Sequence, residues 1–428
     1  MAFFICSQCG YGSASWLGRC PNCGEFNTLK EAPSYLKDDE QDKEETKKLS
    51  LIPFKKIQSL KKDRLKTGVF EFDRVFGGGI VPGEVVLLTG EPGVGKSTLL
   101  LQVLSKRKTV YISGEEAAEQ VKERAERLNI NLDNFLFSDD LQVEGIIEGL
   151  EKLQDKVEVV VIDSIQTVYS KKVEGPPGSI SQLKESAAKL INLAKNIKTA
   201  LIIVGHITKG GEIAGPKSLE HLVDCVLNFE GERVSNLRIL RANKNRFGPT
   251  DEIGIFEMKQ EGLVEVTNQL IFLENKEKQE VGKAIVGIVE GKRPLFFEIQ
   301  TLAVSTFLPV PRRVVKGLDY NKVLLLLAVV RKYLGHPLDK FDIYVNVVGG
   351  VQIKSTASDL GFIASLLSSL KNTPLMKKSI FVGEVGLLGE VRKVNFEDKI
   401  IKEAKRFGFR SIYSSSNLTN VRILKDFI

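Results

Sequence analysis

Short runs of apolar residues alternate with amphipathic, helix-type patterns through the middle of the chain. Five of these runs have the length and the Val, Ile and Leu content of buried strands, at residues 84–89, 108–112, 157–162, 200–205 and 224–229. Strands that are apolar on both faces and are separated by helices are typical of a largely parallel sheet. The pattern therefore predicts an α/β domain over residues 57–272.

A second α/β pattern occupies the last third of the chain. The charged segment 274–280 separates it from the first, so we expect another domain over residues 281–428. Its predicted elements are a long helix, a strand, a helix and a strand, at 320–334, 343–348, 357–370 and 379–383. Near the other end, residues 31–56 contain few apolar side chains. Such a segment cannot bury a core, and we expect a flexible linker there.

The composition is that of a globular protein, with 43% hydrophobic and 27% charged residues. No apolar run approaches the roughly 20 residues of a membrane span, and the start lacks a secretory signal. We therefore expect a cytoplasmic protein with no membrane partner. The net charge is +7, and residues 51–70 carry six basic residues against one acidic residue. This excess permits a polyanionic partner, but a solvated basic surface explains it equally well.

Residues 90–98 carry the most specific motif of the chain. They fit G-x-x-x-x-G-K-[ST] and lie between two apolar runs, as a strand, phosphate loop and helix require. Lys96 would place its charge on the β- and γ-phosphates, and the Ser97 hydroxyl would ligate Mg²⁺. The loop that we expect to bind a nucleoside triphosphate consists of Gly90, Glu91, Pro92, Gly93, Val94, Gly95, Lys96, Ser97 and Thr98.

Polar residues follow three further predicted strands. Asp163 ends the run 159–162, where an acid would hold Mg²⁺ through water. Glu115 and Glu116 follow the strand at 109–112, and one of them would activate the attacking water. We favour Glu115, because an acid at the position of Glu116 is explained by a helix amino terminus. His206 ends the run 200–205, where it would sense the γ-phosphate, although a lone histidine is more often structural.

Four of the five cysteines lie near the amino terminus, as Cys6-x-x-Cys9 and Cys20-x-x-Cys23. Two such pairs in a reducing compartment are typical of one four-thiolate Zn²⁺ site, and we expect a zinc finger over residues 1–30. Four protein sulfurs leave no open position on the metal, so the site would be structural. Redox-active pairs and disulfides are the alternatives, and the absence of a signal peptide disfavours the disulfides.

From end to end the chain resembles the bacterial RadA/Sms DNA repair proteins. The motifs that carry the resemblance are the four cysteines, Thr67-Gly68, the glycines 77–79, Tyr-Ile-Ser-Gly-Glu-Glu at 111–116, Ala-Gly-Pro-Lys-Ser-Leu-Glu-His at 214–221 and Lys-Asn-Arg-Phe-Gly at 244–248. The resemblance implies a RecA-like core that hydrolyses ATP with Mg²⁺ and forms hexameric rings on single-stranded and branched DNA. It also implies branch migration of recombination intermediates, with a RecA-type recombinase as partner.

The resemblance further implies that Lys244 and Arg246 reach the ATP of a neighbouring subunit, as fingers supplied in trans. From the residues alone we would expect a charged turn before Gly248-Pro249. The segment 208–221 lies where RecA-like proteins keep a DNA-binding loop, and its glycines and lysines suit sequence-independent phosphate contacts. A loop that only connects two elements is the alternative.

The carboxy-terminal block resembles the proteolytic domain of Lon, which uses a Ser–Lys pair. Here Ala357 stands at the position of the nucleophile and Arg392 at that of the general base. Alanine has no nucleophilic atom, and arginine stays protonated. We therefore expect a domain that assembles the ring and offers DNA a basic surface, with Arg312, Arg313 and Lys316 as candidates. An ATP-dependent protease and a recombinase mediator that does not translocate are the alternative functions.

Overall fold

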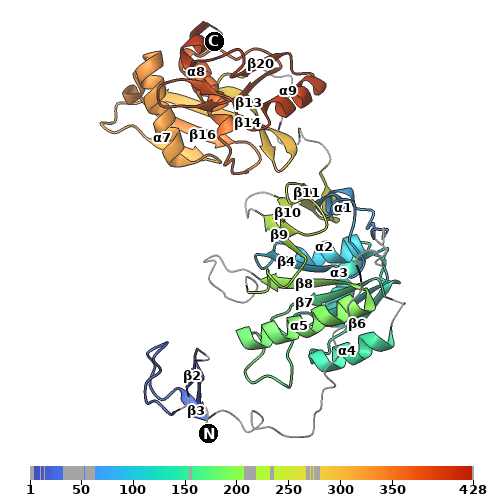
Figure 1. The fold of residues 1–428 in the computed structure, drawn as a ribbon. Coiled ribbons are helices and arrows are strands. Elements are labelled where there is room, and N and C mark those ends of the chain that lie inside the picture. Colours follow the sequence, from blue (N-terminus) through green and yellow to red (C-terminus); the bar gives the residue numbers. More distant parts are fainter. Residues whose placement is uncertain are drawn as a thin grey trace. The chain divides into compact units, whose positions relative to one another are not determined.

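The computed structural model divides the chain into two compact units, residues 1–61 and 62–428 (Figure 1). The residues that the structure describes are 4–9, 11–13, 15–31, 53, 63–153, 157–206, 218–231, 236–266, 270, 273 and 280–426.

The first unit is a three-stranded antiparallel sheet in the order β2-β1-β3. Its strands are β1 (Phe4–Cys6), β2 (Gly12–Ser13) and β3 (Leu29–Glu31). The buried apolar residues described here are Cys6, Cys20 and Leu29, with Phe4 packed against them. A cluster of this size cannot support a fold by itself, so this unit requires a further source of stability.

A nine-stranded sheet forms the first half of the second unit, in the order β12-β11-β10-β9-β4-β8-β7-β5-β6. From β9 to β6 the strands are parallel, and β10 to β12 continue the sheet in antiparallel pairs. The strands are β4 (Val85–Gly90), β5 (Thr109–Ser113), β6 (Phe135–Ser138), β7 (Val159–Asp163), β8 (Ala200–His206), β9 (Cys225–Gly231), β10 (Leu237–Asn245), β11 (Ile253–Lys259) and β12 (Gly262–Glu265).

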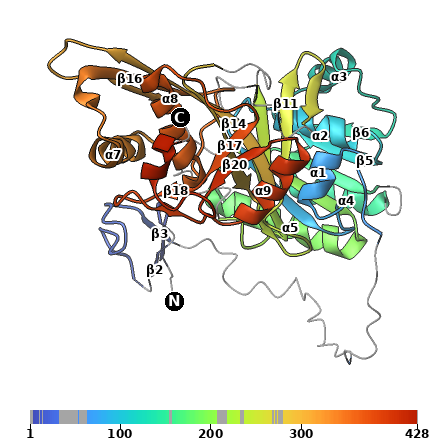
Figure 2. The ribbon, with the colours of Figure 1, turned by 90° about the horizontal axis from the view of Figure 1, so that it is seen from above.

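Helices cover both faces of this sheet (Figures 1 and 2). On one face, α1, α2 and α3 contribute to one hydrophobic core, and on the other α4 and α5 contribute to a second. The helices are α1 (Phe70–Val75), α2 (Lys96–Leu104), α3 (Ala118–Arg127), α4 (Val143–Lys152) and α5 (Ile180–Ile197). The two cores explain why the parallel strands are apolar on both faces.

The five predicted strands of this domain are confirmed as β4, β5, β7, β8 and β9, each within two residues of the expected bounds. The antiparallel strands β10 to β12 were not predicted. Most of Leu237–Asn245 is only partly buried, and polar residues such as Arg238 and Arg241 interrupt its apolar pattern. Strands at the end of a sheet have partly exposed faces, which weakens the apolar signal.

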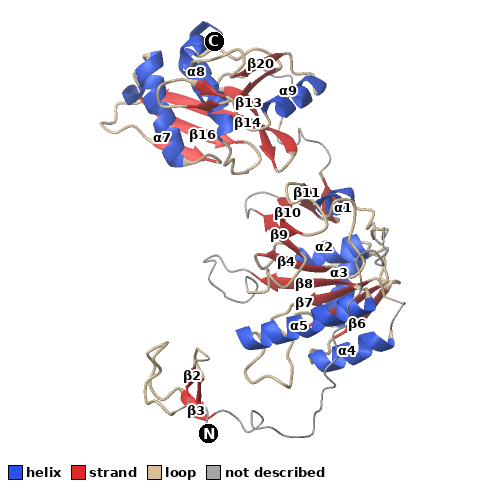
Figure 3. Cartoon of the chain, in the orientation of Figure 1, coloured by secondary structure: helices blue, strands red, loops and turns tan. Residues whose placement is uncertain are grey.

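A six-stranded mixed sheet forms the rest of the second unit, in the order β15-β16-β14-β13-β17-β20 (Figure 3). Its strands are β13 (Lys283–Glu290), β14 (Arg293–Ser305), β15 (Arg313–Lys316), β16 (Phe341–Val347), β17 (Ser379–Val382) and β20 (Ser411–Ser414), beside the pair β18 (Glu384–Val385) and β19 (Val391–Arg392). The helices are α7 (Tyr320–Val329), which continues as a π turn (Val330–Leu334), α8 (Asp359–Lys371) and α9 (Glu397–Arg406), with 3-10 turns at Leu338–Lys340, Thr356–Ser358 and Val421–Asp426. The four elements predicted here are present, whereas the β13–β14 hairpin was not predicted.

The two sheets of the second unit share buried contacts. Ile253 and Ile255 of β11 belong to the same hydrophobic core as the six-stranded sheet. Arg293, at the start of β14, forms a 2.6 Å ion pair with Glu71 of α1, and both side chains are almost fully buried. Burial raises the pKa of Glu71, although Arg293 and the Ile255 N–H oppose this shift. The hairpin β13–β14 is therefore fixed to the nine-stranded sheet and to α1 by apolar packing and by charge.

Among the described residues, no helix is both long and apolar enough to span a membrane.

Candidate functional site

The carboxyl ends of four parallel strands bring the predicted chemistry to one edge of the nine-stranded sheet. Gly90 at the end of β4 is paired with His206 at the end of β8, and Ser113 at the end of β5 is paired with Asp163 at the end of β7. Ligands of open parallel sheets bind beyond this edge. The residues predicted from separate strand ends therefore lie around one site.

The phosphate loop has the predicted form, and α2 begins at Lys96. Gly95 has a φ of +107°, and a Cβ atom there would meet Met258 Cε at 2.8 Å, so only glycine fits. The Arg238 Nε of β10 donates to the Val94 carbonyl oxygen at 3.0 Å. Arg238 thus fixes the backbone of the loop at Val94. The sequence did not reveal this contact because 144 residues separate the two positions.

Lys96 is buried beneath the loop, with 4% of its surface exposed. Its ammonium group donates to the carbonyl oxygens of Gly90 and Glu91, at 3.0 and 3.1 Å. Burial lowers its pKa, while Asp163 and Glu115 oppose this shift. Because this ammonium lies beside the glycine-rich loop at the amino terminus of α2, the arrangement is suited to a polyphosphate.

His206 connects Lys96 to Glu115. Its Nδ1 lies 3.1 Å from Lys96 Nζ, and its Nε2 lies 2.6 Å from Glu115 Oε1. An ammonium only donates and a carboxylate only accepts, so Nδ1 accepts from Lys96 and the Nε2–H group donates to Glu115. The hydrogen bond from His206 holds the pKa of Glu115 below its ordinary value, although partial burial opposes this.

Ser97 and Asp163 meet beside the loop, where the Ser97 hydroxyl donates to Asp163 Oδ2 at 2.7 Å. The buried Tyr111 hydroxyl donates to the same oxygen at 2.5 Å. A hydroxyl and a carboxylate at this position are the oxygen ligands that Mg²⁺ takes in phosphate-loop proteins. The donor set fits the metal, and Tyr111 is a further site residue without an assigned role in the sequence prediction.

The two adjacent glutamates have different partners. Both carboxylate oxygens of Glu116 accept from the guanidinium of Arg124. Glu115 instead accepts from Ser164 and His206 and faces the site, with 37% of its side chain exposed. Glu115 therefore faces the site, whereas Glu116 is held by Arg124.

Lys244 and Arg246 lie near the amino-terminal ends of the parallel strands, away from the carboxyl ends that form the site. Lys244 pairs with Val226 in β9, and Val226 pairs with Leu87 of β4. Three residue steps along β4 separate Leu87 from Gly90, about 10 Å at the usual rise of a strand, and β9 lies between β10 and β4. Lys244 lies in strand β10 and not in a turn, and the two side chains bind Glu220, Val223 and Asp224.

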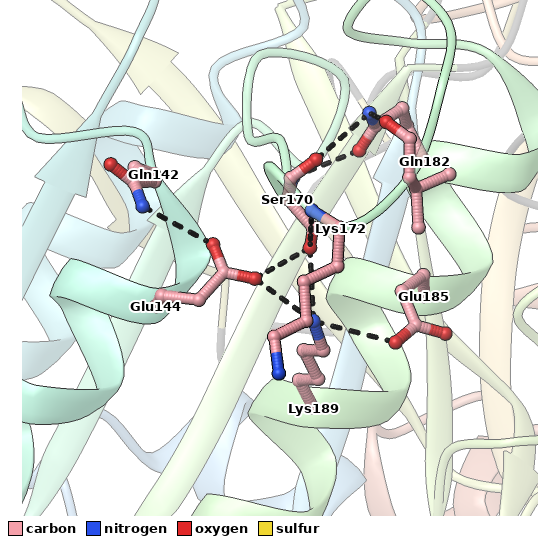
Figure 4. Close-up of polar contacts among 8 residues, drawn as sticks. Gln142, Glu144, Ser170, Lys172, Gln182, Glu185 and Lys189 are labelled. Carbon is pink, nitrogen blue, oxygen red and sulfur yellow. Dashed lines mark hydrogen bonds and ion pairs between the residues drawn. The ribbon is translucent and has the colours of Figure 1, made fainter. Parts of the chain in front are cut away.

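A polar network around Ser170 fixes the loop between β7 and α5 (Figure 4). Lys189 of α5 lies 2.9 Å from both Glu144 Oε1 of α4 and Ser170 Oγ, and the Ser170 hydroxyl also donates to Glu144. Gln182 bonds the N–H and the carbonyl of Ser170. Lys189 is held protonated by Glu144, which raises its pKa against the effect of desolvation. It is therefore no base for Ser170, and the network is structural.

The four amino-terminal cysteines converge as predicted. All four sulfurs lie within 4.8 Å of one another, and the Cys6–Cys23 and Cys9–Cys20 sulfur pairs are 3.7 and 3.6 Å apart. Four thiolates around a tetrahedral metal with bonds near 2.3 Å are about 3.8 Å apart. The cluster therefore fits one metal ion, and no disulfide joins these cysteines.

In the carboxy-terminal domain, Ala357 occupies the position expected for the nucleophile, and it is buried. The Ser358 hydroxyl is buried and donates to the Ser355 carbonyl at 3.0 Å. Arg392 pairs with Glu390. Of the basic candidates, Arg313 donates to the Phe341 and Leu338 carbonyls, while Arg312 and Lys316 are exposed.

The proposed DNA loop at 208–221 lies outside the described residues apart from 218–221.

Comparisons with known proteins agree with this architecture. Residues 65–270 match an ATPase family model described as KaiC, and residues 4–31 match one described as a rubredoxin metal binding domain. The chain is 45% identical to the DNA repair protein RadA of Bacillus subtilis over 97% of its own length and 93% of that protein. It is 45% identical to the DNA repair protein RadA of Listeria monocytogenes over 99% of its own length and 94% of that protein. Among solved structures, the RadB recombinase covers 47% of this chain and 99% of its own, with 25% identity and a TM-score of 0.39.

Proposed function

The chain belongs to the RadA family of DNA repair proteins, and on that premise we propose that it is a DNA-dependent ATPase that moves along single-stranded DNA and promotes branch migration. The observation that carries this proposal is the hydrolysis site at one edge of the sheet, where Lys96, His206 and Glu115 form a continuous hydrogen-bonded chain. A motor needs such a site, and the family relationship supports DNA as the partner.

In the proposed reaction, water attacks the γ-phosphorus of ATP, the bond to the β-phosphate oxygen breaks, and ADP and phosphate leave. Glu115 accepts the proton of the water, and Lys96 stabilises negative charge on the β- and γ-phosphates. Ser97 and Asp163 would hold Mg²⁺, which neutralises phosphate charge when it is bound. His206 keeps Glu115 ionised and touches Lys96, so it is suited to register the γ-phosphate.

We propose that Arg246, with Lys244, completes the ATP site of a neighbouring subunit. Both lie by the amino-terminal ends of the parallel strands, and the phosphate loop follows the carboxyl end of β4. Neither can act on its own phosphate loop across that distance. A role in hydrolysis therefore requires a second subunit, which supports a closed ring, and the hexamer implied by the resemblance is our proposal.

DNA contacts are proposed on the same edge of the sheet as the ATP site. The segment 208–221 directly follows β8 and His206. Lys171 and Lys172 are exposed in the loop that the Ser170 network holds in place. Arg312 and Lys316 offer further charge on the carboxy-terminal domain. Contacts from lysine and arginine to phosphates carry little sequence information, which suits a motor.

For the carboxy-terminal domain we propose ring assembly and DNA contact without proteolysis, since Ala357 supplies no nucleophile and Ser358 is buried. For the amino-terminal cysteines we propose one structural Zn²⁺ ion per chain, because a four-sulfur set leaves it no open position. A RecA-type recombinase is the proposed protein partner.

The test is displacement of a labelled strand from a forked DNA duplex, measured together with ATP turnover. We expect the parent protein to displace the strand only with ATP, and the Lys96→Ala variant to displace nothing. ATP turnover stimulated by DNA without any displacement would instead identify a recombinase mediator. Cleavage of casein by the purified protein would revive the protease alternative.

A further inference from the structure

Both proposed finger residues, Lys244 and Arg246, bind one short segment, residues 218–224, which precedes strand β9. The Lys244 ammonium donates to the carbonyl oxygens of Glu220 and Val223, both at 2.8 Å. Arg246 is bound to the next residue, Asp224. The segment therefore contacts Lys244 and Arg246 through three residues, Glu220, Val223 and Asp224, before β9 begins.

Asp224 is fixed to the sheet and holds Arg246 at the same time. Its N–H donates to the Val85 carbonyl at 2.9 Å, and its Oδ2 accepts from the Val85 N–H at 3.2 Å. Its Oδ1 lies 3.2 Å from Arg246 Nη1, and its carbonyl accepts from the Arg246 N–H at 3.0 Å. Asp224 thus uses both carboxylate oxygens and both backbone groups at this junction.

The burial of the pair is asymmetric. The Asp224 side chain is 6% exposed, whereas that of Arg246 is 54% exposed. Within the described part of the chain, only one guanidinium nitrogen of Arg246, Nη1, has a hydrogen-bond partner. A guanidinium has five N–H donors in a rigid planar group. With one of its nitrogens bound to Asp224, the remaining N–H groups of Arg246 face solvent or a neighbouring subunit.

A buried carboxylate is costly unless its charge is compensated, so the placement of Asp224 needs a reason. We propose that Asp224 is a positioning residue that directs Arg246 toward the ATP of the neighbouring subunit. This inference rests on the proposed function.

The experiment mixes inactive variants and measures ATP turnover with and without single-stranded DNA. Alone, Asp224→Asn is expected to lower the stimulated turnover about 10-fold or more, with the KM for ATP near the parent value. Mixed with Lys96→Ala subunits, it should regain turnover, because intact phosphate loops then meet correctly held fingers. Mixed with Arg246→Ala subunits, it should regain none, since both variants lack a working finger.

Two controls separate the outcomes. If Lys96→Ala and Arg246→Ala subunits form mixed rings without regaining turnover, the trans finger of the proposed function fails, whatever Asp224 does. If the mixture of Lys96→Ala and Arg246→Ala subunits does regain turnover, two results would overturn the inference. One is parent-level turnover by Asp224→Asn alone, and the other is no recovery of turnover when Asp224→Asn is mixed with Lys96→Ala. Asp398→Asn, which breaks an exposed ion pair with Lys393 in α9, should behave as the parent.

Thermal unfolding shows whether Asp224→Asn is folded. If it is not, Asp224→Ser is the second variant, because it keeps an oxygen near the Val85 N–H while it removes the charge. A variant that is folded, binds single-stranded DNA as the parent does and has a lower turnover supports the positioning role of Asp224. Unchanged turnover in a folded variant contradicts it.

Discussion

Ser97 and Asp163 lie 66 residues apart in the chain, yet the Ser97 hydroxyl donates to Asp163 Oδ2 at 2.7 Å. The contact forms because α2 begins directly after β4, and β7 lies two strands away with its carboxyl end at the same edge. Tyr111 of β5 reaches the same carboxylate. Three separate elements thus converge on the oxygen ligands proposed for Mg²⁺.

Substitution of Lys96 tests the phosphate loop. We expect Lys96→Ala to reduce ATP turnover to background, because the loop loses its charge on the β- and γ-phosphates. The Gly90 and Glu91 carbonyls that Lys96 satisfies lie beside solvent-exposed loop residues, so water can replace the ammonium and the fold should persist. Turnover by phosphate release and far-ultraviolet circular dichroism check both points. Parent-level turnover would refute the assignment.

Substitution of His206 tests the proposed base through the pH dependence of turnover. The hydrogen bond from His206 lowers the pKa of Glu115, and the active form is the carboxylate. Turnover therefore falls as the pH drops through this pKa, and loss of the donor raises the pKa. We expect His206→Ala to move the acidic limb of the pH–rate profile to higher pH.

His206→Gln retains an N–H donor and should keep the acidic limb near its parent position. Glu115→Gln should lower turnover by about 10²- to 10⁴-fold while ATP still binds. An acidic limb that does not move in His206→Ala would show that another group accepts the proton.

The sequence was most informative where the chemistry is contiguous. The phosphate loop and the four cysteines were predicted residue by residue, because their spacing is itself the signal. Asp163, Glu115 and His206 were placed from strand ends, which parallel pairing brings together. By contrast, Arg238 on Val94 and Arg293 on Glu71 depend on contacts over 144 and 222 residues, and no local pattern specifies them. Strand β10 escaped prediction because most of its residues are only partly buried and arginines interrupt its apolar pattern.

The buried ion pair between Arg293 and Glu71 gives a prediction for stability. We expect Arg293→Met to lower the free energy of unfolding by about 3 kcal/mol, because the buried Glu71 carboxylate loses its 2.6 Å ion pair and keeps only a 3.7 Å contact with Arg74 and the bond from the Ile255 N–H. Lys152→Met, which removes an exposed i,i+4 pair with Glu148 in α4, should change it by less than about 0.5 kcal/mol. Urea denaturation at pH 7 measures both. Equal effects would show that the pair adds nothing beyond a surface contact.

The cysteine cluster gives a prediction for metal content. We expect one zinc ion per chain, with Zn–S distances near 2.3 Å by X-ray absorption. Chelation should unfold residues 4–31, because their apolar cluster is too small to hold the sheet alone.

Cys9→Ser should lower the zinc content, and Cys225→Ala should leave it unchanged, since Cys225 lies in β9 outside the cluster. Purified protein that contains no zinc after growth in zinc-replete medium would contradict this assignment.

Coupling of ATP hydrolysis to DNA is tested most directly by the ATP turnover rate with and without single-stranded DNA. We expect a rate that rises with added single strand, that loses this increase as salt screens the phosphate contacts, and that is absent in Lys96→Ala. A turnover rate that stays the same with and without single-stranded DNA, at low as well as at physiological salt, would contradict it.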